Sequence, residues 1–404
     1  MNHDLGSALQ AQVMAAIASK QSVAIVGGGS KTFLRSPQII TPSPFEGEGW
    51  GEGREPEKQP SPQPLAPDWS RSDLAKVDKT FTVSPMVGEG VNPMYLASHR
   101  GVIAYEPSEL YITARSGTPV AEIETMLAER NQMLACEPPH FDGGANMASL
   151  GGAVACGFSG SRRPYAGSLR DHMLGVKLLN GKGEILSFGG QVMKNVAGFD
   201  VSRLMAGARG TLGALLEVTI KVLPKPEASL TVVFECPLDE APKRMSAFAR
   251  RSIPLSALAW FEGHIFLRLE GTEVAIRAAH GQTGGEIAAS GPQFWHGLRE
   301  QTHPFFKTGL PLWRMSVPPA SNLAMPFDEV FMDWAGALRW WRTDKPAVEV
   351  EALAHAVDGH ATLFRDATPV LGSQPPAQLA ALHQRLKLAF DPHGIFNPSV
   401  MGYF

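Results

Sequence analysis

The chain has 404 residues, 44% of them hydrophobic and 19% charged, which is typical of a globular protein with two or three packed lobes. Its formal net charge is -3 and it has no Lys/Arg-rich run, so nucleic acid is excluded as an expected partner. Cys136, Cys156 and Cys236 match neither a metal-binding CxxC pair nor a disulfide framework. We therefore expect a reducing, cytoplasmic location.

The sequence shows neither a secretory signal nor a membrane-spanning segment. The first twenty residues lack the basic and apolar regions of a secretory signal. The longest apolar stretches, such as 150–158, are interrupted by glycine and are far shorter than the roughly 20 residues that span a bilayer. We expect any contact with the inner membrane to be peripheral and to come through partners.

The first elements are predicted as a helix, a strand and a glycine turn. Apolar residues recur at helical spacing over 4–19, and 22–26 is short and β-prone before Gly27. Residues 37–67 then carry eight prolines among mostly small, polar residues, so they cannot bury enough apolar surface to order themselves. The sequence predicts an insertion at 37–92 that is disordered at least over 37–67.

Regular patterns resume after the insertion. The predicted strands are 101–105, 111–114, 174–179, 185–188, 215–222 and 230–235. The predicted helices are 120–131, 202–206 and 378–390. Pro224 and Pro226 end one unit, and residues 229 to about 370 form another α/β unit.

The first chemical signal is a strand that runs into Gly27, Gly28, Gly29 and Ser30. Three missing side chains let backbone N–H groups converge on an anion such as phosphate. The loop is not a Walker A motif, because Ser30 and not glycine precedes Lys31, and it is not GxGxxG, because Thr32 takes the sixth place. A plain tight turn is the alternative.

The second signal is the small-residue segment 141–160. Small residues at this density let a backbone approach a large flat ligand, and Ser149 and Ser159 can donate hydrogen bonds to it. The alternative is the start of a close-packed helix.

Ordered blocks extend these signals over about residues 20–226. The chain resembles the FAD-binding domain shared by vanillyl-alcohol oxidase, para-cresol methylhydroxylase and the D-lactate and glycolate oxidases, in blocks 27–30, 105–110, 148–152, 165–171 and 207–213. Within that family it is similar to the FAD-binding subunit of bacterial glycolate oxidase, in runs 136–141, 159–164, 192–200 and 391–398.

The resemblance implies an α+β fold with a two-lobed vanillyl-alcohol-oxidase-type FAD-binding domain followed by a smaller α/β C-terminal domain. The expected boundaries are 1–36 and 93–226 for the FAD-binding domain, 37–92 for the insertion and 227–404 for the C-terminal domain, including the family tail 378–404.

The resemblance also assigns cofactor-binding residues. The loop Gly27, Gly28, Gly29 and Ser30 is expected to hold the FAD pyrophosphate, and backbone groups at Val218 to face the adenine. The residues expected at the pyrophosphate and the isoalloxazine side are Ser149, Gly151, Gly152, Ser159 and Gly160. No covalent attachment site is matched, so FAD is expected to bind non-covalently, and no metal site is predicted.

The implied activity is oxidation of glycolate to glyoxylate, with electrons passing to an iron–sulfur subunit and a quinone. Three scattered cysteines cannot hold an iron–sulfur cluster, so the expected partners are an iron–sulfur subunit and a second FAD-containing subunit. The alternatives are a non-catalytic scaffold with the same fold, or a stand-alone FAD-dependent 2-hydroxy-acid oxidoreductase.

The chain departs from the family in its substrate residues. A C-terminal histidine-rich motif of hydroxy-acid oxidases is not visible, and His355 and His360 stand five apart, off a common helical face. Catalytic residues therefore stay unassigned, and the chain is expected to need its partners for activity. Arg365 is a candidate carboxylate anchor; Arg162 and Arg163 are more typical of a solvated surface.

Overall fold

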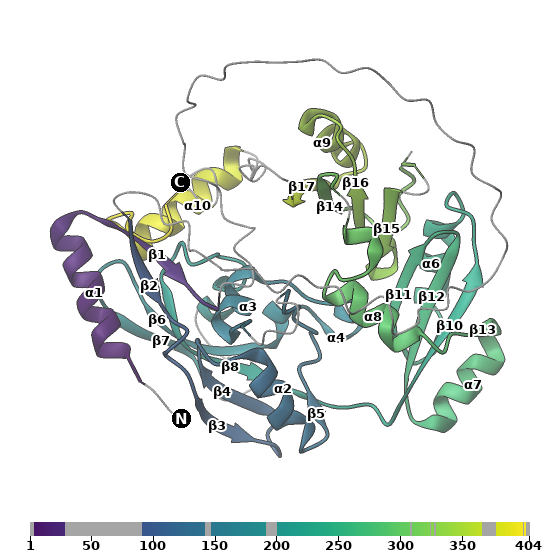
Figure 1. The fold of residues 1–404 in the computed structure, drawn as a ribbon, viewed down its shortest axis with the longest axis horizontal. Helices are drawn as coiled ribbons and strands as arrows, with labels where there is room; N and C mark the ends of the chain where they lie inside the picture. Colours follow the sequence, from purple (N-terminus) through teal and green to yellow (C-terminus); the bar gives the residue numbers. More distant parts are fainter. Residues whose placement is uncertain are drawn as a thin grey trace, which may run out of the picture.

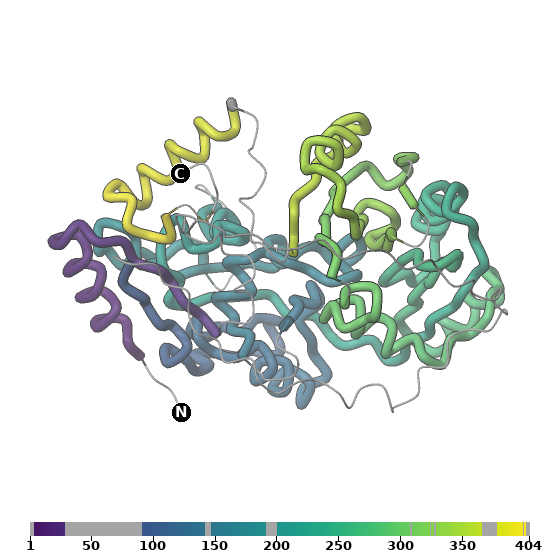
Figure 2. The backbone as a smooth tube through the Cα atoms, turned by 45° about the horizontal axis from the view of Figure 1, so that its top comes forward, coloured from purple at the N-terminus to yellow at the C-terminus, as the bar shows by residue number. Residues whose placement is uncertain are grey.

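The computed structural model describes residues 4–28, 91–141, 147–190, 200–307, 309–323, 325–326, 329–365, 377–398 and 400. Figure 1 shows two bodies side by side, with the N-terminal half of the chain, in purple to teal, beside the segment 228–365, in green. Figure 2 shows that the last helix, in yellow, returns to lie over the N-terminal body.

The first lobe consists of α1 (Gly6–Ser19) and two parallel strands, β1 (Ser22–Val26) and β2 (Val91–Tyr95). The helix buries Leu9, Val13 and Ala16, which recur at helical spacing, against the strands and the neighbouring sheet. The predicted helix and the strand at 22–26 are confirmed. The expected insertion is two residues too long, because β2 already begins at Val91 and pairs with β1.

The second lobe is an antiparallel five-stranded sheet in the order β3-β4-β8-β6-β7. Its strands are β3 (Val102–Glu106), β4 (Tyr111–Arg115), β6 (Met173–Leu179), β7 (Ile185–Gly189) and β8 (Ala214–Lys221). A separate two-stranded ribbon joins β5 (Gln132–Met133) to β9 (Leu223–Pro224). The helices are α2 (Val120–Ala128), α3 (Leu150–Cys156), α4 (Arg163–Ala166) and α5 (Val201–Leu204), with the 3-10 turn η3 (Leu169–His172).

Helices α2 and α3 pack their apolar residues on one face of this sheet. Val120, Ile123 and Leu127 of α2 are fully buried, because their spacing puts them on one side of the helix. The predicted strands and the helix of this lobe are confirmed, and α2 ends at Ala128 rather than at residue 131.

The C-terminal domain contains an eight-stranded sheet in the order β13-β10-β12-β11-β15-β16-β14-β17. Its strands are β10 (Ala228–Glu235), β11 (Leu255–Phe261), β12 (His264–Gly271), β13 (Glu286–Ile287), β14 (Leu312–Ser316), β15 (Val330–Asp333), β16 (Leu338–Arg342) and β17 (His360–Arg365). The helices are α6 (Ala241–Ala249), α7 (Glu273–Thr283), α8 (Gly291–Arg299) and α9 (Ala347–His355), with the 3-10 turns η4 (Pro304–Lys307) and η6 (Trp334–Gly336).

Alternate residues of this sheet face two different cores. One core contains residues of α6, α7 and α9, and receives Trp313 and Met315 of β14. The other receives Leu312 of the same strand and faces the N-terminal lobes, from which Phe141 and Phe158 pack against it. The sheet therefore presents a wall of side chains to the N-terminal body.

The tail of the chain packs with the N-terminal lobes. Phe396 forms a parallel bridge with Val23, and Lys387 of α10 (Ala377–Phe390) donates hydrogen bonds to the carbonyl oxygens of Thr211 and Phe396, at 2.7 and 2.8 Å. The expected domain boundary placed 378–404 in the C-terminal domain. This was wrong for the described part of that range, because the tail contacts residues of both N-terminal lobes.

Candidate functional site

A pocket lined by glycines and other small residues lies where the first lobe, α3 and the tail meet. We call it the glycine-lined pocket. Its walls are the loop after β1, the first turns of α3, the turn 207–213 and the tail; they carry Gly27, Gly28, Ser149, Gly151, Gly152, Cys156, Arg209, Gly210, Gly213 and Asn397. Four segments far apart in the sequence thus surround one cavity.

The glycines of this pocket have no room for a side chain. A Cβ at Gly28 would overlap the carbonyl oxygen of Met147, and one at Gly151 would lie 2.6 Å from the Cβ of Ser116. A Cβ at Gly27 would lie 2.9 Å from the Ser149 hydroxyl oxygen. Backbone segments pack together so closely here that only glycine fits, and the pocket wall consequently presents backbone groups.

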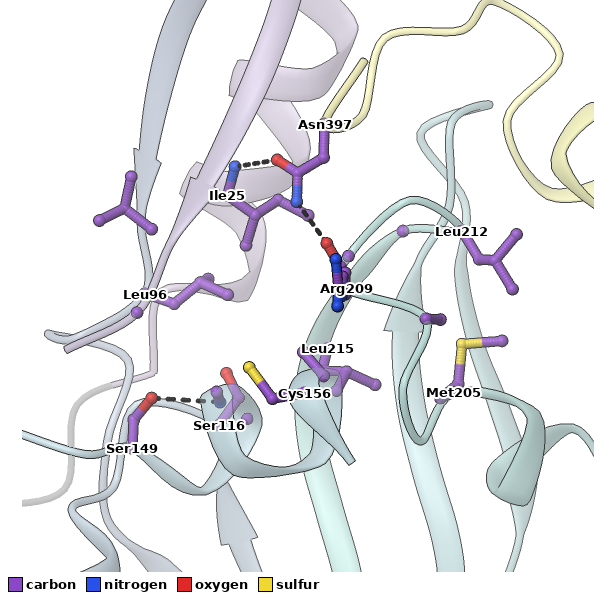
Figure 3. A pocket seen from close by; sticks show the side chains of 18 of the residues that line it. Ile25, Leu96, Ser116, Ser149, Cys156, Met205, Arg209, Leu212, Leu215 and Asn397 are labelled. Carbon is purple, nitrogen blue, oxygen red and sulfur yellow. Dashed lines mark hydrogen bonds between the residues drawn. The ribbon is translucent and has the colours of Figure 1, made fainter. Parts of the chain in front are cut away.

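The tail fixes two of the walls relative to each other (Figure 3). The side-chain oxygen of Asn397 accepts a hydrogen bond from the Ile25 N–H, at 2.8 Å, and its nitrogen donates to the Arg209 carbonyl, at 2.7 Å. Gly210 adopts a positive φ of 73°, and a Cβ there would lie 2.6 Å from Asn397. The single amide side chain of Asn397 therefore connects β1 with the turn 207–213.

Ser149 caps the start of α3. Its side-chain oxygen accepts a hydrogen bond from the Gly152 N–H, at 3.2 Å, which satisfies one of the free donors at the beginning of the helix. The Ser149 hydroxyl group can still donate one hydrogen bond, and Ser149 lines the glycine-lined pocket.

The predicted cofactor residues separate into groups. Gly27, Gly28, Ser149, Gly151 and Gly152 line the glycine-lined pocket together. Gly29 and Ser30 lie outside the described residues, as does most of the run 192–200. Ser159 and Gly160 line a second pocket instead.

Val218 lines neither of these two pockets. It is fully buried in β8, and this strand is paired with β4 on one side and with β6 on the other. Because strands on both sides use the backbone groups of β8, Val218 is not free to present them to a ligand. Leu215 of the same strand reaches the glycine-lined pocket.

The second pocket lies between the N-terminal lobes and the eight-stranded sheet. We call it the junction pocket. Aromatic side chains form much of its wall, with Phe158 and Phe364 in contact at a ring-centroid distance of 5.4 Å and Trp340 at 4.8 Å from Phe364. The polar groups among these rings are Ser159, Ser161, Arg299, Gln301, Arg314 and Asp333.

Asp333 is a buried carboxyl group in the junction pocket. It accepts hydrogen bonds from the Ser161 hydroxyl, at 2.8 Å, and from the Trp334 N–H, at 2.7 Å. Burial raises the pKa of Asp333 to about 7, against the opposing effect of these two hydrogen bonds. The group can therefore hold or release a proton near neutral pH.

A network of buried ions crosses from the second lobe to the C-terminal domain. Arg162 pairs with Glu137 and with Glu270, and Arg268 pairs with Glu137 at 2.9 Å. Burial alone raises the pKa of Glu137, but the charges of Arg268 and Arg162 outweigh it, so the pKa is lowered. The expectation of a solvated Arg162 was wrong, because its acid partners include one 108 residues away in the sequence.

The other substrate candidates do not gather at one place. Arg163 is exposed, and its guanidinium lies 4.2 Å from the ring of Trp334. Arg365 donates a hydrogen bond to the Gln301 side chain, at 2.8 Å. His355 ends α9, and His360 begins β17.

The sequence did not point to Arg314, Asp333 or Asn397. Arg314 and Asp333 stand on strands of the C-terminal domain, and no recognised motif contains them. Asn397 falls within the recognised tail run 391–398, which was the one signal for its role.

Comparisons with known proteins agree with this geometry. A family model described as FAD binding domain matches residues 88–189. Glycolate oxidase subunit GlcE of Escherichia coli (strain K12) is 43% identical over 325 residues, which cover 80% of this chain and 90% of that protein. The chain belongs to the GlcE family of glycolate oxidase subunits.

More distant proteins resemble this chain in part of the sequence or in fold. A D-lactate dehydrogenase of Anaerostipes hadrus is 28% identical over 203 residues, covering 46% of this chain and 41% of that protein. The solved structure of an alkyldihydroxyacetonephosphate synthase superposes with a TM-score of 0.58 at 12% identity, covering 98% of this chain and 75% of the other. The predicted fold class and family are confirmed, and with them FAD as the cofactor.

The glycine-lined pocket of this GlcE-family chain fits a dinucleotide cofactor. Glycines that admit no Cβ expose backbone donors, and small residues of α3 leave a wall that a flat ring system can approach. Among the residues that the structure describes, no helix is long and apolar enough to cross a membrane.

Proposed function

We propose that this chain holds FAD non-covalently in the glycine-lined pocket and acts as one subunit of a glycolate oxidase that converts glycolate to glyoxylate. The observation that carries the proposal is the meeting at one cavity of residues from three recognised blocks, namely Gly27 and Gly28 of the first block, block 148–152 and block 207–213. The 43% identity to a glycolate oxidase subunit, over 90% of its length, supports the substrate.

The proposed cofactor position follows the two pockets. The loop that begins with Gly27 and Gly28 holds the pyrophosphate, together with Ser149, Gly151 and Gly152. Ser159 and Gly160 stand at the isoalloxazine side, because they line the junction pocket between the lobes and the C-terminal domain. Bound FAD supplies a hydride acceptor for the carbon that carries the substrate hydroxyl.

Electrons leave this subunit through partners in the proposed complex. Burial raises the pKa of the Cys136 thiol to about 12, so this sulfur stays protonated and is unsuited to bind iron. Cys136, Cys156 and Cys236 are too scattered in the sequence for a cluster. We infer an iron–sulfur subunit and a second FAD-containing subunit, a cytoplasmic location and peripheral membrane contact through these partners.

The visible spectrum of the purified chain tests the proposal. We expect the chain alone to carry FAD but to reduce it slowly or not at all when mixed anaerobically with millimolar glycolate. Coexpression with the partner subunits should restore rapid bleaching of the flavin band. A chain that purifies without FAD, even from the complex, would contradict the proposed function.

A supporting role without chemistry is the second candidate, because the sequence lacks the histidine-rich substrate motif of hydroxy-acid oxidases. In that case the FAD of this subunit would stay oxidised in the complete complex during turnover. Rapid bleaching of the lone chain by glycolate would instead favour a stand-alone oxidoreductase.

A further inference from the structure

Arg314 is a half-buried cation of the junction pocket with no acid partner. It extends from the middle of β14, and its guanidinium lies 5.2 Å from the ring centroid of Trp334. Within the described part of the chain its guanidinium forms no ion pair and no hydrogen bond, and the charges that act on it are those of Arg163 and Arg209. Burial, and then repulsion by these two arginines, lower the pKa of Arg314 to about 10.

An arginine in such a place needs an anion. A guanidinium that is partly withdrawn from water and has no hydrogen-bond partner is costly, and in proteins such a cation is usually paired with a neighbouring carboxylate. Asp333 lines the same pocket but forms no ion pair with Arg314; its hydrogen-bond partners are Ser161 and the Trp334 N–H. The junction pocket is therefore lined both by a cation that has no acid partner and by a carboxyl group.

A second polar group near Asp333 also lacks a partner. The Tyr165 hydroxyl oxygen is buried and forms no hydrogen bond within the described part of the chain. Burial, and then the negative charge of Asp333, raise the pKa of this hydroxyl, so it remains a donor. The region around Asp333 thus has unused hydrogen-bonding capacity.

We propose that the junction pocket is a binding site for a small 2-hydroxy acid, in which Arg314 binds the carboxylate and Asp333 accepts a hydrogen bond from the hydroxyl group. The inference rests on the proposed function and adds the residues that recognise the acid. Arginine suits this task because its planar guanidinium matches a carboxylate with two parallel hydrogen bonds.

The size of the pocket selects among acids. The centres of water-sized molecules can occupy about 30 Å³ of it, which is room for roughly two water molecules. Aromatic rings of Phe158, Phe364 and Trp340 bound it, so a longer acid would have to displace packed side chains. A short acid such as glycolate fits this description better than one with a large substituent.

Calorimetric titration of the full chain with oxalate tests the site without turnover, because oxalate has no C–H bond to oxidise. We expect oxalate to bind and the neutral analogue oxamide not to bind. Arg314→Gln should weaken oxalate binding by at least about tenfold, the effect of losing a charge-assisted hydrogen bond. Arg314→Lys keeps the charge, and should bind more tightly than Arg314→Gln but less tightly than the natural chain.

Arg277→Gln is the matched control, since Arg277 is exposed on α7 and does not line the junction pocket. It should leave the oxalate affinity unchanged. An absence of oxalate binding to the natural chain, equal affinity in Arg314→Gln, or equal loss in Arg277→Gln would overturn the proposal. The FAD spectrum of each sample is recorded separately, so a failure of the proposed cofactor function is distinguished from a failure of this site.

Discussion

The glycine-lined pocket exposes backbone and small side chains, whereas the junction pocket is walled by large aromatic rings with charged groups between them. The first pocket depends on the absence of Cβ atoms at particular positions, such as Gly28 and Gly151. The second depends on the presence of particular side chains, such as Arg314 and Asp333. In the proposed assignment, backbone groups hold the cofactor in the first pocket and side chains hold the substrate in the second.

The first prediction concerns the glycine-lined pocket, where an added side chain should prevent the cofactor from binding. Gly28→Asp should abolish FAD retention, because its Cβ would overlap the Met147 carbonyl and its carboxylate would repel the pyrophosphate. The absorbance ratio of flavin to protein measures the occupancy. This is the largest effect we expect.

Gly281→Asp provides the control, since Gly281 lies on the exposed surface of α7 with nothing within 4 Å of an added Cβ. It should purify with full flavin content. Full occupancy in Gly28→Asp as well would show that this loop does not hold the pyrophosphate.

The second prediction tests whether the tail is part of the glycine-lined pocket. Lys387→Met should reduce the free energy of unfolding by about 3–5 kcal/mol, because it leaves the fully buried Asp391 without its cation. Two carbonyl oxygens also lose their donor. Chemical denaturation followed by tryptophan fluorescence measures the change.

Arg385→Met on the exposed face of α10 is the control, and should change the free energy of unfolding by less than about 0.5 kcal/mol. If Lys387→Met were equally mild, the tail would not be held by this ion pair. A loss of FAD affinity that accompanies the destabilisation would indicate that the tail supports the pocket wall through Asn397.

The difference between the pockets also explains what could be predicted from the sequence. Glycine runs such as 27–29 are local patterns with a backbone meaning, so the first pocket was recognisable from the amino-acid sequence alone. Ser161 and Asp333 are 172 residues apart, and neither one alone suggests a site. The sequence favoured a solvated Arg162 because its partner Glu270 is remote along the chain.

The same reason applies to the fold. The strand at 22–26 and the helix at 378–390 follow periodic patterns that are complete within each segment, and both were predicted. The return of the tail to β1 depends on contacts of Asn397 and Phe396 with residues more than 180 positions away. A local sequence pattern cannot predict such contacts.

A third prediction concerns Asp333 and pH. Because burial raises the pKa of Asp333 from 3.8 to about 7, this group favours the folded state below pH 4 and loses that contribution as the pH rises to 7. Asp333→Asn should therefore gain stability relative to the natural chain between pH 4 and pH 7, with an upper limit of about 4 kcal/mol.

Urea denaturation of both proteins at several pH values measures this difference. Above pH 8 the difference should be constant, since the group is ionised in both the folded and the unfolded chain. A difference that stays the same from pH 5 to pH 8 would mean that Asp333 is already ionised in the junction pocket at low pH.

The smallest effect is expected from the segment between the first two strands, which lies outside the described residues. Residues 37–67 carry eight prolines and no apolar periodicity, so the sequence assigns them to neither pocket. Strands β1 and β2 are parallel neighbours, and parallel strands need a connection of roughly a dozen residues or more. Deleting 37–67 leaves about thirty residues between Val26 and Val91, which is enough. Halving a connection changes the closure free energy by only about 0.6 kcal/mol. The shortened chain should therefore keep its FAD content and its oxalate affinity, and loss of either would show that this segment contributes to one of the two pockets.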